Sequence, residues 1–223
     1  MKLDNRLNAV LKFIDVSDIV ADIGADHGYL SKAMLDKGIK RVQVVENKIG
    51  PLNNAERNLK NYANVSFSLS DGIEAIDDDI DTCVICGMGG FNIIDILSAN
   101  LKQARKFKKI ILQPNSHVEK LRLYLSDNHF HIIDEDLIQI DKHFYHIIVL
   151  DNQKINKKIS ENEILFGPVL LKKQPIELLN KYQMVVNVYK EVLKGNLSDV
   201  ERDRITKEIK LICDSIHGVK YES

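Results

Sequence analysis

Residues 20–30, Val20-Ala21-Asp22-Ile23-Gly24-Ala25-Asp26-His27-Gly28-Tyr29-Leu30, decide the fold of this 223-residue chain. An apolar run ends in an acid, two glycines follow four positions apart, and a helical pattern comes next. This order predicts a buried strand, a tight turn and the start of a helix, which is where α/β proteins hold nucleotide-like ligands. Glycine permits a positive φ and lets a ligand approach without meeting a Cβ. A plain structural turn is the alternative.

The acids near this loop argue against a diphosphate ligand. Asp22 and Asp26 would repel phosphates, and the glycines do not follow the G-x-G-x-x-G register. Glu46 ends the predicted strand 41–45 and follows the loop by about 20 residues, the distance at which an acid accepts both ribose hydroxyls. Such a site suits a neutral or cationic nucleoside. S-adenosylmethionine (SAM), which carries a sulfonium and an ammonium, is one.

Polar residues and glycines also follow three further predicted strands, 65–69, 82–86 and 109–112. The segments after them are Ser70-Asp71-Gly72, Gly87-Met88-Gly89-Gly90 and Gln113-Pro114-Asn115. Asp71 predicts either an acceptor for an adenine amino group or a simple Asp-Gly turn, and Gly87-Met88-Gly89-Gly90 predicts an open loop before a helix. In open α/β sheets ligands bind outside the carboxyl ends of the strands, so we expect one site there.

The end of the predicted sheet separates classes of α/β protein. The β-rich runs 131–140 and 144–150 are joined by only Asp141-Lys142-His143, which predicts a hairpin. A terminal antiparallel hairpin does not fit the six-stranded dinucleotide pattern. It is the layout of class I SAM-dependent methyltransferases, an α/β class with a Rossmann-like, seven-stranded sheet.

An amphipathic helix over 4–14 is expected to lie at the edge of this domain, near the ligand.

The pattern changes after residue 152. Apolar residues recur at steps of three and four in two runs, which predicts coiled-coil-like seams on two helices. The runs are Leu179, Tyr182, Val186, Tyr189, Leu193 and Ile205, Ile209, Ile212, Ile216. Gly195-Asn196 turns the chain between them. We expect residues 1–152 to form the methyltransferase domain and residues 153–223 a C-terminal helical hairpin, which serves either packing or RNA contact.

Composition restricts compartment and partners. The N-terminal residues mix charged and apolar side chains, which predicts neither a signal peptide nor a membrane span and favours a cytoplasmic protein. Cys83 and Cys86 lie within an apolar strand-like run, so we expect them in the core, with no metal site. Residues 1–100 carry 10 Lys and Arg against 15 Asp and Glu, whereas residues 101–223 carry 21 against 17. An acidic partner such as RNA therefore fits the second half, through basic residues at Lys102, Arg105, Lys106, Lys108, Lys109, Lys172, Lys173, Lys181, Lys190 and Lys194.

Six segments read together resemble the TrmK family of bacterial tRNA adenine-N1 methyltransferases. They are ADIGADHGYL, VENKIGP, SDGIEAI, ICGMGG, ILQPN and FGPVLLKK, at residues 21–30, 45–51, 70–76, 85–90, 111–115 and 166–173. The resemblance covers nearly the whole chain. It implies a class I methyltransferase domain with a coiled-coil-like tail that uses SAM to methylate adenine 22 of tRNA. We expect tRNA and SAM as partners, no membrane or metal, and a monomer or weak dimer.

The resemblance also implies which residues form the site. The cofactor residues are Asp22, Gly24, Asp26, His27, Gly28, Glu46, Asn47, Asp71, Gly72 and Gly87. The catalytic candidates are Asp26, Tyr29, Gly87, Met88 and Asn115. Gly87-Met88-Gly89-Gly90 stands where other amino-methyltransferases carry an Asn/Asp-Pro-Pro-aromatic motif, so the acceptor of the amine hydrogen bond is not identified. Two other functions stay open, a small-molecule SAM methyltransferase and a non-catalytic RNA-binding module.

Overall fold

A computed structural model describes residues 3–152 and 158–221 of the chain. Within these residues, seven strands form one sheet in the order β3-β2-β1-β4-β5-β7-β6. Their bounds are β1 Ile19–Ile23, β2 Arg41–Glu46, β3 Val65–Leu69, β4 Thr82–Gly89, β5 Lys109–Ser116, β6 His131–Ile140 and β7 His143–Asp151. The strands β1 to β5 run parallel, and β7 is antiparallel to both β5 and β6. The predicted seven-stranded, Rossmann-like sheet with a terminal antiparallel hairpin is confirmed.

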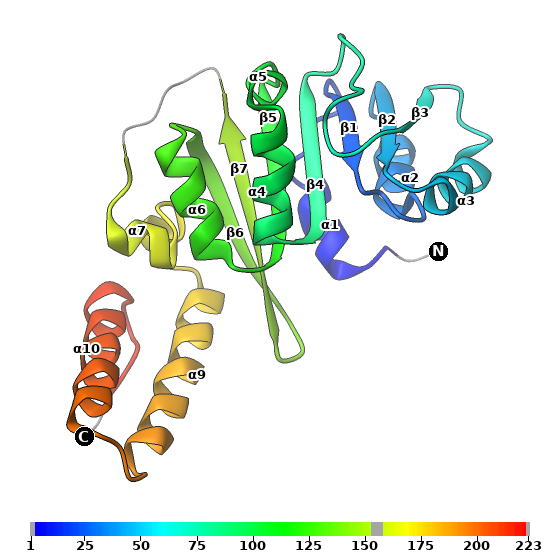
Figure 1. Ribbon diagram of the computed structural model, residues 1–223. Coiled ribbons are helices and arrows are strands. Elements are labelled where there is room, and N and C mark those ends of the chain that lie inside the picture. Colours follow the sequence, from blue (N-terminus) through cyan, green and yellow to red (C-terminus); the bar gives the residue numbers. More distant parts are fainter. Residues whose placement is uncertain (1–2, 153–157, 222–223) are drawn as a thin grey trace.

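Helices cover both faces of this sheet (Figure 1). The helices α1 Asn5–Leu11, α2 Tyr29–Asp36 and α3 Ile49–Leu59 pack on one face, and α4 Gly90–Ala99, α5 Leu101–Ala104 and α6 Val118–Asp127 on the other. Side chains alternate along each strand, so Val20 and Val84 meet the first set of helices while Ala21 and Cys83 meet the second. This two-sided burial explains why the central strands β1 and β2 are mostly apolar.

The cysteine pair lies where the sequence predicts. Cys83 is fully buried in the core, and Cys86, three residues further along β4, is partly buried on the opposite face of the sheet. Burial raises the pKa of both thiols above its ordinary value. A protonated thiol is a poor nucleophile and a poor metal ligand, so a core role fits Cys83, whereas Cys86 is only partly within the core. In the described part of the chain, no helix is long and apolar enough to cross a membrane.

The segment Gly87-Met88-Gly89 corrects one prediction. It is not an open loop, because it continues β4 and pairs with β5, which itself continues through Gln113-Pro114-Asn115 to Ser116. The pairing shifts register between Cys86 and Met88, and Gly87 has a φ of 77°. A bulge of this kind bends the strand and re-aims its backbone. The helix that follows begins at Gly90, and the leading helix is shorter than expected, Asn5–Leu11.

The C-terminal arm, residues 158–221, contains α7 Glu161–Phe166, α8 Leu170–Lys173, α9 Ile176–Leu193 and α10 Asp199–Ser215. The pairs Ser160/Glu163 and Ser198/Glu201 each form a capping box, and Gly167 ends α7. The helices α9 and α10 form the antiparallel hairpin at the lower left of Figure 1. Their shared core buries Val186, Ile205, Ile209 and Ile212, as the seams predict, and also Leu178, which no seam includes.

The arm and the sheet share a core. Leu137 of β6 is buried, and Phe144 of β7 is partly buried, against α9 and α10. The predicted division into 1–152 and 153–223 has its boundary beside residues 153–157, which lie outside the described residues. It stays a prediction, and the shared core indicates that the arm is held against the β6-β7 hairpin.

Candidate active site

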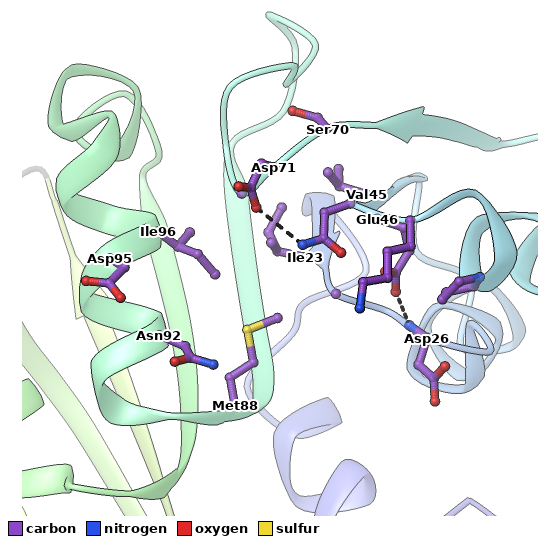
Figure 2. Close-up of a pocket in the computed structure, with 15 residues that line it drawn as sticks. Ile23, Asp26, Val45, Glu46, Ser70, Asp71, Met88, Asn92, Asp95 and Ile96 are labelled. Carbon is purple, nitrogen blue, oxygen red and sulfur yellow. Dashed lines mark hydrogen bonds between the residues drawn. The ribbon is translucent and has the colours of Figure 1, made fainter.

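A cavity of about 480 Å³ opens at the carboxyl edge of β1, β2, β3 and β4 (Figure 2). Its lining comes from the ends of these strands, from the first turn of α3 and from the first two turns of α4. The lining residues are Ile23, Gly24, Asp26, Val45, Glu46, Asn47, Lys48, Pro51, Ser70, Asp71, Gly72, Met88, Asn92, Asp95 and Ile96. Seven of the residues predicted from strand ends therefore meet in one place, as expected for parallel strands whose carboxyl ends share an edge.

Two hydrogen bonds tie the strand ends together around this cavity. The Glu46 carboxylate accepts a hydrogen bond from the backbone N–H of Asp26, and the Asn47 amide donates to Asp71 Oδ1 at 3.4 Å. Both are drawn in Figure 2. Glu46 is only 6% exposed, and burial raises the pKa of its carboxyl. The cavity wall therefore carries an acid whose position is held by the glycine loop.

The backbone conformation at Gly24 favours glycine. Its φ is 69°, and a Cβ built there would lie 2.1 Å from Met88 Cε. Any side chain at this position would displace Met88, which forms the wall between the β1 loop and α4 in Figure 2. The glycine thus leaves room for a wall side chain as well as for a ligand.

A second cavity, of about 220 Å³, adjoins the first and shares Gly24 and Asp26 with it. It is lined by Arg6, Leu7, Asp22, Gly24, Ala25, Asp26, Tyr29, Leu30, Cys86 and Gly87. The leading helix α1 supplies Arg6 and Leu7, so it lies at the carboxyl edge of the sheet, as expected. The predicted residues Asp22, Tyr29 and Gly87 belong to this smaller cavity, and Asp26 stands where the two cavities meet.

The bulge at Gly87 is held by three side chains, two of which the sequence did not single out as site residues. Gln113 Oε1 accepts the Gly87 N–H at 3.1 Å, and Asn115 Nδ2 donates to the Gly87 carbonyl at 2.6 Å. Arg6 Nη1 donates to both amide oxygens, Gln113 Oε1 and Asn115 Oδ1, at 3.2 Å. Arg6 and these amides are more than 100 residues apart in sequence, so no local pattern links them.

His27 and Gly28 lie elsewhere. Neither lines the larger cavity. The His27 ring stacks on Tyr29 with ring centroids 5.4 Å apart. A Cβ on Gly28 would lie 3.1 Å from Leu59 Cδ1 and 3.3 Å from Ala55 Cβ, both on α3. Gly28 thus allows α2 and α3 to pack closely, and the structure gives it no position against a ligand.

Asp22 is buried at the end of β1 and accepts a hydrogen bond from Ser31 Oγ at 2.5 Å. Burial raises its pKa to about 6. The folded chain therefore keeps this carboxyl protonated up to a higher pH than the unfolded chain does.

From this shift we expect the stability of the wild-type chain relative to Asp22→Asn to fall as the pH rises from about 4 to about 6. The folded state binds more protons than the unfolded state in this window, so raising the pH favours unfolding, by about 3 kcal/mol in total. Urea unfolding of both chains at several pH values measures the difference. A difference that does not vary with pH would contradict the assignment.

The structure argues against several of the predicted phosphate contacts. Lys109 Nζ lies 2.9 Å from Asp15 and 2.6 Å from Asp18, and Lys108 Nζ lies 3.3 Å from Asp81. These pairs surround the beginning of β5, at the edge of the sheet opposite the cavities. Arg105 donates to the Asn128 carbonyl and covers the Phe130 ring, and Lys181 bonds His146 Nε2 at 2.7 Å. These four side chains already bind partners within the protein, so they are poor candidates for phosphate contacts.

Comparison with known proteins extends these observations. The sequence-family model TrmK, tRNA (adenine(22)-N(1))-methyltransferase, matches residues 20–221. The chain belongs to the TrmK family. The tRNA (adenine(22)-N(1))-methyltransferase of Bacillus subtilis is 29% identical over 233 residues, covering 99% of this chain and 96% of the relative.

Solved TrmK structures agree with the fold over its whole length. Bacillus subtilis TrmK superposes with a TM-score of 0.80 at 27% identity, covering 96% of this chain and 99% of that one. Mycoplasma capricolum TrmK, solved with S-adenosylhomocysteine, has a TM-score of 0.83 at 27% identity, with coverages of 99% and 100%. Sp1610 of Streptococcus pneumoniae, solved with SAM, has a TM-score of 0.83 at 28% identity, with coverages of 97% and 100%. The C-terminal arm is therefore part of the TrmK architecture.

Proposed function

We propose that this chain transfers a methyl group from SAM to N1 of adenine 22 in tRNA. The observation that carries the proposal is the convergence of Glu46, Asp71 and Asp26 on one cavity, beside a smaller cavity, in a chain of the TrmK family. Methyl transfer needs a site for each of two ligands and a boundary at which they meet. Glu46 would bind the ribose, Asp71 would bind the adenine amine, and Asp26 lies at the boundary between the two cavities.

The larger cavity fits SAM. Its charged lining consists of Asp26, Glu46, Asp71 and Asp95 with Lys48, an excess of negative charge that repels diphosphates and suits a sulfonium. Glu46 would accept hydrogen bonds from the ribose hydroxyls, and Asp71 with Asn47 would hold the adenine. When bound, SAM supplies an electrophilic methyl group. Gly24 keeps the β1 loop free of a Cβ at this point.

The smaller cavity fits the acceptor base. The lone pair on N1 of adenine attacks without prior deprotonation, so positioning supplies most of the catalysis, on the order of 7 kcal/mol for an effective molarity of roughly 10⁵ M. Asp26, between the two cavities, orients the exocyclic amine and takes the proton that the methylated base releases. Tyr29 offers its ring to the base, which must leave its stack in the tRNA at a cost of a few kcal/mol.

Asn115, Gly87 and Met88 shape the site, and none of them takes a proton in the proposed reaction. Asn115 Oδ1 already accepts hydrogen bonds from Arg6 and from Gln113 Nε2, at 3.2 and 3.1 Å, and its Nδ2 holds the Gly87 carbonyl. It is therefore a positioning residue for the bulge, and Asp26 is the candidate for the missing acceptor of the amine hydrogen bond. Met88 shapes the wall of the cofactor cavity.

We expect Asp26→Asn to lower kcat by about 10²-fold, because the amide keeps the size of the carboxylate but is a weaker hydrogen-bond acceptor for the exocyclic amine and so positions the base less well. Methyl transfer at saturating SAM and tRNA measures kcat. Asp78→Asn is the matched control, since Asp78 is exposed and lines neither cavity. A kcat within threefold of the wild-type value, or an equal loss in both variants, would remove Asp26 from this role.

The experiment that tests the function is methyl transfer from labelled SAM to unmodified tRNA transcripts, followed by digestion and separation of the nucleosides. The expected product is N1-methyladenosine, and a transcript with guanine at position 22 should stay unlabelled. SAM binding without transfer to any transcript would favour a small-molecule substrate. Binding of tRNA without SAM binding would favour a non-catalytic RNA-binding module.

We also propose that the chain works in the cytoplasm, as a monomer or weak dimer and without a metal. Attack by a nitrogen lone pair needs no Lewis acid, and tRNA modification supports the cytoplasmic location. Methyl transfer should be unchanged by EDTA, and sedimentation equilibrium should give a mass close to 25.4 kDa at low concentration. A rate that falls with EDTA, or a tight oligomer, would contradict these points.

A further inference from the structure

A shallow groove of about 320 Å³ lies beside the smaller cavity, and Tyr29 is the one residue of its lining that the mechanism above uses. It is lined by His27, Tyr29, Asn54, Arg57 and Asn58, from the loop after β1, the start of α2 and one side of α3. Tyr29 lines both the groove and the smaller cavity. An RNA strand with one nucleotide in the smaller cavity would therefore pass Tyr29 to place its neighbouring nucleotide in the groove.

The groove presents an exposed aromatic stack. The His27 and Tyr29 rings lie 26° from parallel, and Tyr29 is 39% exposed. The Asn58 amide donates to the His27 carbonyl at 3.0 Å, which fixes the loop that carries the histidine. Exposed rings held in this way are the usual platform for an unpaired nucleobase.

The polar side of the groove favours a phosphate. Arg57 is exposed, and the described residues engage two of its N–H groups, through the Asn53 carbonyl at 3.2 Å and the Asn54 side chain. A guanidinium has five such donors, so the remainder can meet an anion. Among the described residues no carboxylate lines the groove, whereas four line the larger cavity. The Asp26 carboxylate lies 3.7 Å from His27 Nε2, so the part of the groove that favours an anion is at Arg57 on α3.

We propose that this groove binds the nucleotide next to the methylated adenine, with its base on the His27–Tyr29 stack and its phosphate at Arg57. The inference rests on the proposed function and deepens it. The groove holds the RNA strand on one side of the extracted adenine, and this contact favours a nucleotide with an unpaired base over a small molecule.

The test uses the full chain and tRNA transcripts that are either intact or abasic at position 21 or 23. His27→Ala should raise KM for intact tRNA by about tenfold and leave the Kd for SAM within twofold. One of the abasic transcripts should show a similar rise with the wild-type chain, and His27→Ala should add nothing further on it. Arg57→Gln should weaken tRNA binding and lower its salt dependence by about one phosphate contact. Lys60→Gln, which removes an exposed charge at the C-terminal end of α3 and outside the groove, is the control.

Each other outcome has a definite meaning. An equal rise in KM for His27→Ala on the intact and both abasic transcripts, or no rise at all, would overturn the proposal that the groove binds a nucleotide. A weaker SAM affinity in His27→Ala would overturn it in favour of the cofactor role predicted from sequence. If the wild-type chain methylates none of the transcripts, the proposed function fails instead, because the groove is judged only by differences between variants.

Discussion

Replacing Glu135 with glutamine should lower the free energy of unfolding by about 3 to 5 kcal/mol. Glu135 and Arg122 are both fully buried, and their side chains form an ion pair at 2.8 Å. Glutamine keeps the shape of the side chain but leaves the Arg122 charge without a partner. Urea unfolding of the full chain measures the loss. Glu56→Gln, at an exposed position of α3, is the control and should change stability by less than about 0.5 kcal/mol.

This pair lies at the junction between the sheet and the C-terminal arm. Glu135 Oε2 accepts the Val169 N–H at 2.9 Å, and Arg122 Nη1 donates to the carbonyls of Ile164 and Leu165 at 3.3 and 3.2 Å. A second, double replacement of Glu135 and Arg122 by methionine should recover part of the loss, since it removes both charges together. A change below 1 kcal/mol in Glu135→Gln would show that the junction does not depend on the charge.

The junction continues through His146 to α9. His146 Nδ1 lies 3.3 Å from Arg122 Nη2, and its Nε2 bonds Lys181. Burial lowers the pKa of His146. Burial also lowers the pKa of Lys181, to about 8. A neutral imidazole between two cationic side chains is what such burial favours. The junction therefore ties the arm to α6, β6 and β7.

Replacing Glu46 with alanine should weaken SAM binding by about 10- to 100-fold for each ribose hydroxyl that it binds, because a hydrogen bond from a hydroxyl to a carboxylate is worth about 1.5 to 3 kcal/mol. Isothermal titration with SAM measures the affinity. Glu74→Ala is the matched control, since Glu74 is exposed and lies outside the cavity in the segment after β3.

Two results would count against this assignment. An affinity within threefold of the wild-type value would mean that the ribose is held by other groups. A large loss of stability in Glu46→Ala would mean that the carboxylate mainly holds the loop, because it also accepts the Asp26 N–H. Urea unfolding of the ligand-free variant separates the two effects.

The sequence by itself determined the sheet, the place of the cofactor cavity and the two long C-terminal helices. Local periodicity shows which residues face inward, and the carboxyl ends of parallel strands must share an edge. That is why Gly24, Glu46 and Asp71 were predicted together and meet in one cavity. The capping boxes of α7 and α10 are equally local, since four consecutive residues contain all their partners.

Only the tertiary structure decided which charges and amides are partners. Arg6 reaches Gln113 and Asn115, and Arg122 reaches Glu135, through the packing of separate elements. Lys109 appears basic and available in the sequence, yet Asp15 and Asp18 hold it at the opposite edge. Periodicity reports burial along one element, whereas ion pairs, the bulge at Gly87 and the groove at His27 depend on how elements distant in the chain are brought together.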